Sequence, residues 1–87
     1  MRELQVVVPA AAEAERVKFT AHLVSLASRY VSNITIMDAR NNIDLKSIMG
    51  MMTIVISSGK TFNIEIDGDD EDVAAESILE FFVERSV

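Results

Sequence analysis

The sequence predicts a single α+β domain in which one four-stranded sheet carries all of its helices on one face. Two observations lead to this fold class. The chain alternates between strand-like and helix-like segments in the order strand, helix, strand, strand, short helix, strand, helix. Its helices carry apolar stripes that need another layer to cover them. With 87 residues, 49% of them hydrophobic, the chain can build one core but not two, so we expect one domain over residues 1–87.

The first strand is expected over residues 2–8, where apolar side chains alternate on one face. Pro9 ends this strand, because proline has no backbone N–H to donate to a sheet. The alanine-rich segment 9–15 has no strand pattern and is expected to be a loop that leads into a helix.

A helix is expected over residues 16–31, because its polar residues fall on one narrow stripe at helical spacing. This stripe consists of Lys18, His22, Ser25, Arg29 and Ser32. The rest of the circumference is apolar, which suits a helix that lies on a sheet and touches a second helix. Arg16 falls on the apolar side, so we expect it at the start of the helix, where it can reach solvent.

The middle of the chain predicts a hairpin and then a short helix. Strands are expected over residues 33–38 and 43–46, joined by a turn at 39–42, where asparagines tolerate left-handed backbone angles. The short helix is expected over 47–54. Ser47 is its predicted N-cap, since a serine hydroxyl can accept a hydrogen bond from a backbone N–H one turn further on.

The C-terminal part predicts one strand and one helix. Residues 61–67 alternate strictly between apolar and polar side chains, which is typical of a half-buried strand. The acidic run 68–72 begins a helix that extends to Arg85, because carboxylates in a first turn complement the helix dipole. The buried face expected for this helix consists of Ala74, Ala75, Ile78, Leu79, Phe81 and Phe82.

Charge and composition exclude several classes of function. The net charge is −6, so we expect no binding to nucleic acid and none to an anionic membrane. The chain has no cysteine, which excludes disulfides, thiolate metal sites and a cysteine nucleophile. No apolar run approaches the ~20 residues of a membrane span, and the first residues lack the long apolar core of a signal peptide. We therefore expect a cytoplasmic protein.

One metal site needs to be considered, a calcium loop with Glu65, Asp67, Asp69 and Glu76 at some of the ligand positions. The sixth position of that loop would be Asp70, where such a loop needs glycine for its turn. Strand pairing also competes for the first two carboxylates. No serine–histidine–acid set, phosphate-binding loop or zinc spacing appears either. We expect no metal, no cofactor and no enzymatic activity.

One segment carries a specific resemblance. Residues 44–52 read Asp-Leu-Lys-Ser-Ile-Met-Gly-Met-Met, which closely resembles the regulatory serine segment of HPr, the histidine phosphocarrier of the bacterial sugar phosphotransferase system. The element order, the length, the Ala-Ser-Arg-Tyr sequence at 27–30 and the acidic run at 68–72 are also similar to that family. The resemblance covers essentially the whole chain. It implies an open-faced β-sandwich with four antiparallel strands under three helices, in the order β-α-β-β-α-β-α.

The chain departs from the family at the active histidine. In the family this residue caps the first long helix within a Gly-hydrophobic-His-Ala-Arg-Pro-Ala pattern, where helix N–H groups favour a phosphoryl group. Aligning the serine segments without gaps puts Arg16 where the histidine belongs and Lys18 where the arginine belongs. A guanidinium has no usable lone pair to carry a phosphoryl group. The sequence therefore predicts that the chain does not carry phosphohistidine by the family's route.

His22 is the only histidine and defines the alternative hypothesis, a phosphocarrier that uses a non-standard residue. It lies on the solvent stripe about two turns past the helix start. At that place it lacks the N-terminal amides that would hold a phosphoryl group, so we expect an ordinary surface histidine.

The resemblance implies that Ser47 is also a site of regulatory phosphorylation, as the matching serine is in many Gram-positive bacteria. A phosphate there would meet the positive end of the short helix, beside Ile48, Met49 and Met52. Methionines suit an adaptable protein-binding surface, so we expect Met49 and Met52 to be exposed in front of buried Ile54 and Ile56. The expected protein-binding residues are Arg16, Lys18, Thr20, Lys46, Ile48, Met49 and Met52.

In the family this surface contacts HPr kinase, the general phosphotransfer enzyme and a transcription regulator. The sequence therefore predicts a non-catalytic regulatory module that binds protein partners of the phosphotransferase and carbon-regulation system. A domain that kept the fold for an unrelated interaction of its acidic surface is a third hypothesis.

Overall fold

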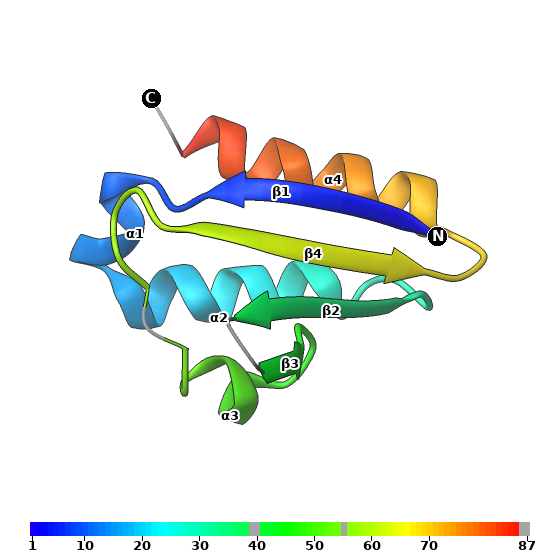
Figure 1. The fold of residues 1–87 in the computed structure, drawn as a ribbon, viewed down its shortest axis with the longest axis horizontal. Helices are drawn as coiled ribbons and strands as arrows, with labels where there is room; N and C mark the ends of the chain where they lie inside the picture. Colours follow the sequence, from blue (N-terminus) through cyan, green and yellow to red (C-terminus); the bar gives the residue numbers. More distant parts are fainter. Residues whose placement is uncertain (39–40, 55, 86–87) are drawn as a thin grey trace.

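The computed structural model describes residues 1–38, 41–54 and 56–85. These residues form one sheet and the helices that lie against it (Figure 1). The strands are β1 (Arg2–Val7), β2 (Asn33–Asp38), β3 (Asn41–Asp44) and β4 (Thr61–Asp67). The helices are α1 (Ala10–Ala14), α2 (Arg16–Ala27), α3 (Ile48–Met51) and α4 (Glu71–Glu84).

The sheet has the strand order β1-β4-β2-β3, and all neighbouring strands are antiparallel. Its register places four apolar side chains in one row across the sheet, namely Leu4, Ile64, Ile36 and Ile43. The neighbouring row is polar and consists of Glu3, Glu65, Thr35 and Asp44. Because successive side chains of a strand point to opposite faces, the apolar row faces the helices and the polar row faces the bare side of the sheet.

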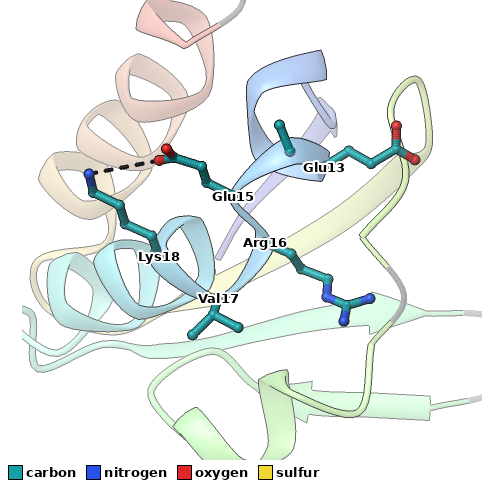
Figure 2. A pocket seen from close by; sticks show the side chains of 6 residues that line it. Glu13, Glu15, Arg16, Val17 and Lys18 are labelled. Atoms are coloured by element: carbon teal, nitrogen blue, oxygen red, sulfur yellow. Dashed lines mark ion pairs between the residues drawn. The ribbon is translucent and has the colours of Figure 1, made fainter.

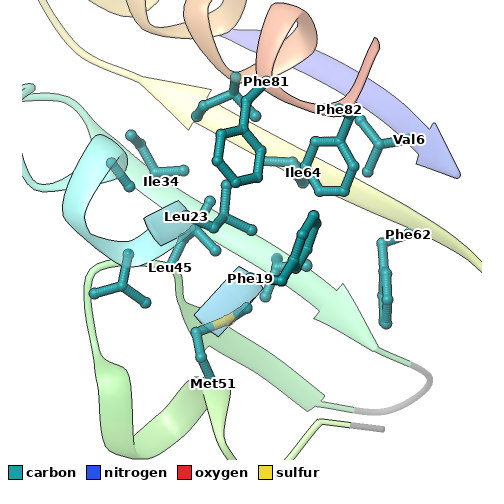
Figure 3. Packing of buried hydrophobic residues seen from close by; sticks show 14 of the residues in the cluster. Val6, Phe19, Leu23, Ile34, Leu45, Met51, Phe62, Ile64, Phe81 and Phe82 are labelled. Atoms are coloured by element: carbon teal, nitrogen blue, oxygen red, sulfur yellow. The ribbon is translucent and has the colours of Figure 1, made fainter. Parts of the chain in front are cut away.

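The hydrophobic core lies between this sheet and the helices α2 and α4 (Figure 3). Phe19 of α2 contacts Phe81 and Phe82 of α4, with ring centroids 5.2 and 5.6 Å apart. Leu23 of α2 and Met51 of α3 are also buried. Removing these apolar side chains from water is the main term that stabilises the fold.

The predicted fold class is confirmed, and two strands, β2 and β4, coincide with their predicted ranges. Along β4 the inner side chains Phe62, Ile64 and Ile66 are buried, as the strict alternation predicted. The helix predicted from the acidic run is α4, which begins at Glu71 and ends one residue before the predicted end.

The prediction was wrong in two connections. Residues 10–14, expected to be a loop, form the short helix α1, because alanine has the highest helix propensity. β3 begins at Asn41 and ends at Asp44, and each limit lies two residues before the predicted one, so Asn41 and Asn42 belong to the strand and not to the turn. Residues 39 and 40 of that predicted turn lie outside the described residues. Four helices, rather than three, therefore accompany the sheet in the described part of the chain.

The end of α2 also differs from the prediction, because the helix stops at Ala27 and not at Val31. The carboxylate of Asp70 accepts hydrogen bonds from the backbone N–H groups of Val31 (2.9 Å) and Ser32 (3.0 Å). These bonds tie residues 31 and 32 to the start of α4. Ser32 is consequently buried, although the helical pattern placed it on the solvent stripe.

The helices bury narrower faces than the sequence predicted. Val17 of α2 and Leu79 of α4 are exposed, although both belong to apolar arcs of their helices. The sheet and one neighbouring helix bury only part of the surface of each helix, and a helical wheel does not show where the buried part ends. Among the described residues, no helix has the length and apolar character to cross a lipid bilayer.

Candidate protein-binding site

The start of α2 is the first candidate region. Glu15 separates α1 from α2, and its side chain makes no capping hydrogen bond. Arg16 is the first residue of α2 and its side chain is exposed, as predicted. A surface hollow of about 610 Å³ lies here (Figure 2), lined by Glu13, Ala14, Glu15, Arg16, Val17 and Lys18. The hollow thus brings together two carboxylates, Glu13 and Glu15, and two basic side chains, Arg16 and Lys18, at a helix start whose N–H groups no side chain caps.

The two basic side chains of this region point to different sides of α2 (Figure 2). Arg16 and Val17 lie on the side of α3, whereas Lys18 lies on the side of α4, with its Nζ 3.7 Å from Oε2 of Glu15. Val17 is 63% exposed. The start of α2 therefore presents Arg16 and Val17, and not Lys18, toward the short helix α3.

The start of α3 is the second candidate region, and Ser47 is its N-cap, as predicted. The Oγ of Ser47 accepts a hydrogen bond from the backbone N–H of Gly50 at 3.1 Å. A Cβ at position 50 would lie 2.9 Å from Cγ2 of Ile43 and 3.2 Å from the Oγ of Ser47. The cap therefore depends on the glycine at position 50 as well as on the serine.

Three apolar side chains beside this cap form a surface that we call the methionine patch, defined as Ile48, Met49 and Met52. Met49 is 82% exposed and Met52 is 45% exposed. Met51, between them, is buried and fixes the short helix to the core. The predicted exposure of the two methionines is confirmed, as is the burial of Ile54 and Ile56 behind them.

A chain of hydrogen bonds holds the segment before α3 in place. The carboxylate of Asp44 accepts from the backbone N–H of Lys46 at 2.9 Å. The ammonium group of Lys46 donates to the carbonyl oxygen of Tyr30 at 2.7 Å. The hydroxyl of Tyr30 in turn donates to Oγ of Ser77 at 2.6 Å, which links the segment to α4. The segment that leads into the methionine patch is therefore held to the rest of the fold by hydrogen bonds.

The structure does not bring all predicted binding residues to one surface. Thr20 is 1% exposed and faces the core, so the prediction that it contacts a partner was wrong. Lys46 is half-buried, with its ammonium group engaged by Tyr30. A helical wheel drawn from the sequence could not show these orientations, because each depends on contacts with other elements.

Val17 is a residue that the sequence analysis missed, since its apolar side chain was assigned to the buried arc of the helix. Its position next to Arg16, in the first turn and before the helix is fully covered, was the available signal. Its exposed side chain points toward α3, the helix beside which the methionine patch lies (Figure 2).

His22 lies in the second half of α2 and is exposed. As predicted, it is too far along the helix to meet the N–H groups of the first turn. The N–H groups that hold a phosphoryl group at a helix start are therefore out of its reach.

The acidic segment before α4 serves the fold. Asp70 accepts from the hydroxyl of Ser32 and from the N–H groups of Val31 and Ser32. These hydrogen bonds, led by that of the hydroxyl, hold the pKa of the Asp70 carboxyl below its usual value. Within the described ranges, no three histidine, cysteine, aspartate or glutamate side chains gather as they would around a metal ion.

The sequence and fold match known proteins along most of the chain. A family model described as the PTS HPr component phosphorylation site matches residues 5–84. A phosphocarrier protein HPr from Xylella fastidiosa is 38% identical over 66 residues, which cover 76% of this chain and 74% of the relative. The HPr-like protein Crh from Halalkalibacterium halodurans is 38% identical over 61 residues, which cover 70% of this chain and 73% of the relative.

A solved structure gives the same result for the fold. The crystal structure of HPr-C-His from Thermoanaerobacter tengcongensis superimposes with a TM-score of 0.85 at 25% sequence identity. The match covers 99% of this chain and 96% of that one. The chain therefore belongs to the HPr family of the phosphotransferase system.

Proposed function

We propose that this protein is a non-catalytic regulatory module of the phosphotransferase system, which binds protein partners and does not carry phosphohistidine. The observation that carries this proposal is Arg16 as the first residue of α2, where the family's active histidine would stand. A phosphoryl group needs a nucleophilic lone pair, and a guanidinium offers none because it stays protonated in proteins.

The partner surface consists of the methionine patch together with Arg16 and Val17. Flexible, polarisable methionine side chains adapt to different partners, and an exposed apolar patch marks a protein-binding surface more often than a structural one. The partners we propose are HPr kinase and a transcription regulator, which use the matching surface in the family. We place the protein in the cytoplasm, where these partners act.

A regulatory role also agrees with the relatives. One relative carries the name HPr-like protein Crh, and a solved Crh is described as a catabolite repression protein of Bacillus subtilis. Crh is thus an HPr-like protein whose name refers to regulation and not to phosphate transport. We propose that this chain, too, acts in regulation and not in phosphate transport.

Ser47 would act as the switch of this surface. Its Oγ lies at the start of α3, so a phosphate there would face the positive end of that helix and leave the fold intact. The added charge would lie beside the methionine patch. A partner with a nearby arginine would bind more tightly through charge-assisted hydrogen bonds, whereas a partner with acidic groups would be repelled.

The test exposes the protein separately to Enzyme I with phosphoenolpyruvate and to HPr kinase with ATP, and then measures the intact mass. We expect no phosphate from Enzyme I and one acid-stable phosphate from HPr kinase, which Ser47→Ala abolishes. Arg16→His is the matched variant, because it restores the imidazole at the helix start and should gain an acid-labile phosphate from Enzyme I.

The alternative function, a phosphocarrier that uses His22, is favoured by the first relatives, which are named phosphocarriers. The same experiment decides between the two. An acid-labile phosphate on the wild-type protein that disappears in His22→Ala would establish the carrier and contradict the regulatory proposal.

A further inference from the structure

A second surface lies between α2 and α4, on the side of α2 opposite to α3 (Figure 1). A hollow of about 250 Å³ opens here, which we call the α2–α4 hollow, and its lining residues are His22, Ser25, Leu26, Arg29, Phe81 and Arg85. Two of these side chains are positively charged, a third is an imidazole, and none is acidic. We propose that the α2–α4 hollow is a binding site for a phosphate-type anion.

The polar residues of this hollow come from α2, the turn that follows it and the end of α4. His22 and Ser25 stand at positions i and i+3 of α2 and share one face, and Arg29, two residues beyond the end of that helix, lines the same hollow. Arg85 approaches the same face from the C-terminal end of α4. Two elements that are distant in the sequence thus place their basic groups around one opening.

The guanidinium of Arg85 is held in position before any ligand arrives. Its central carbon lies 3.6 Å from the centroid of the Phe81 ring, and its Nη1 donates to the carbonyl oxygen of Phe81 at 3.2 Å. A guanidinium has five N–H donors, so several remain for a ligand. This stacking lowers the entropy that Arg85 loses when it binds an anion.

The basic groups of the hollow have no carboxylate partner within the residues that the structure describes. The ion pairs of the described residues involve Met1, Arg2, Lys18 and Lys60. None of them involves His22, Arg29 or Arg85. Acidic residues outnumber basic ones by 14 to 8 in this chain. Within residues 1–38, 41–54 and 56–85, the guanidinium groups of Arg29 and Arg85 thus form no ion pair, which leaves them open to an external anion.

The dimensions and chemistry of the hollow select a small phosphate. Its volume lies below the ~300–1,000 Å³ of pockets that bind drug-sized ligands, so it suits an ion or the end group of a small monoester. Phosphate offers several acceptor oxygens to the two arginine forks and to the Ser25 hydroxyl. An adjoining hollow shares Leu26, Phe81 and Arg85 but adds Glu80 and Glu84, whose negative charges disfavour an anion there.

The experiment is an NMR titration of the ¹⁵N-labelled full chain with inorganic phosphate at constant ionic strength, with chloride as the other anion. We expect saturable shifts of the amide signals of Ser25, Arg29 and Arg85. Arg29→Gln and Arg85→Gln should each raise the Kd about tenfold, the effect of one charge-assisted hydrogen bond. Methyl phosphate serves as a second arm, and its binding would assign the site to a monoester end group rather than to the free ion alone.

Arg2→Gln is the control, because it changes the net charge equally but removes a residue that pairs with Asp72 in the other end of α4. It should leave the Kd unchanged. Shifts that fail to saturate, that chloride reproduces, or that Arg2→Gln weakens as much as the two test variants would overturn the proposal. Because Arg29 is exposed, its variant keeps the test valid if Arg85→Gln lowers the stability of the fold.

Discussion

The starts of α2 and α3 lie in neighbouring parts of the molecule but are built in different ways. α3 begins with a serine that caps its own helix through the N–H of Gly50. α2 begins after Glu15, whose side chain caps nothing, and with an exposed Arg16. The comparison teaches that the two positions are constrained differently. Among the described residues, the side chain of Arg16 makes no hydrogen bond or ion pair, whereas Ser47 also stabilises the helix that it caps.

The largest effect should come from the side chain that anchors α3. Met51→Ala should lower the free energy of unfolding by about 2–5 kcal/mol, because it leaves a cavity in the core. Met49→Ala is the matched control and should change it by no more than about 0.5 kcal/mol, since this methionine is exposed. Urea denaturation of both variants measures the difference. Equal losses of unfolding free energy in the two variants would contradict the distinction between a buried face of α3 at Met51 and an exposed face at Met49.

A smaller effect is expected at the cap of α3. Ser47→Ala should cost roughly 0.5–2 kcal/mol of stability, because the N–H of Gly50 loses its acceptor. Ser47→Asp should cost much less, since a carboxylate also caps and favours the helix dipole. Thermal melts give the stabilities, and a pull-down from a cytoplasmic extract compares the partners. If wild type, Ser47→Ala and Ser47→Asp all retain the same partners, Ser47 is a cap and not a switch.

The start of α4 sharpens the comparison, because its N-cap Asp70 accepts hydrogen bonds from Ser32 and Val31 rather than from its own helix. These bonds lower the pKa of Asp70, so their contribution is present at neutral pH and is lost as the pH falls through the folded-state pKa. We expect wild type to be more stable than Asp70→Asn at pH 7.

This advantage should shrink below about pH 4, where the carboxyl becomes protonated. Denaturation curves of both proteins at several pH values test the prediction. A difference that stays constant with pH would show that the charge of Asp70 contributes nothing.

The smallest effect is expected at the start of α2. Glu15→Ala should change the stability by no more than about 0.5 kcal/mol, because the side chain makes no cap and its ion pair with Lys18 is exposed. The same denaturation assay applies. A loss as large as that of Ser47→Ala would remove the distinction between the two helix starts.

The strands were more predictable than the binding surface. Strict alternation identified β2 and β4 with their correct limits, because a period of two residues is a local signal. The Ser47 cap was also visible in the sequence, since capping needs only the residues of one turn. Local patterns of this kind were sufficient for the fold class.

The composition of the candidate site was less predictable. Thr20 was expected on the surface but is buried, and Val17 was expected in the buried arc but is exposed. The elements packed against α2 decide which part of the helix is covered. The engagement of Lys46 with Tyr30 depends on a contact between segments 16 residues apart. Such orientations arise from packing between elements, which helical or strand periodicity does not encode.

The bare face of the sheet has a consequence for how copies of this protein meet. Its polar row places Glu3 directly opposite Glu65, with Asp44 further along. Two molecules that approached each other through these flat faces would bring carboxylates against carboxylates. The repulsion extends over a screening length of ~10 Å at 0.1 M salt and grows as salt is removed. We therefore expect the face that no helix covers to disfavour contacts between copies, and to do so more strongly at low salt.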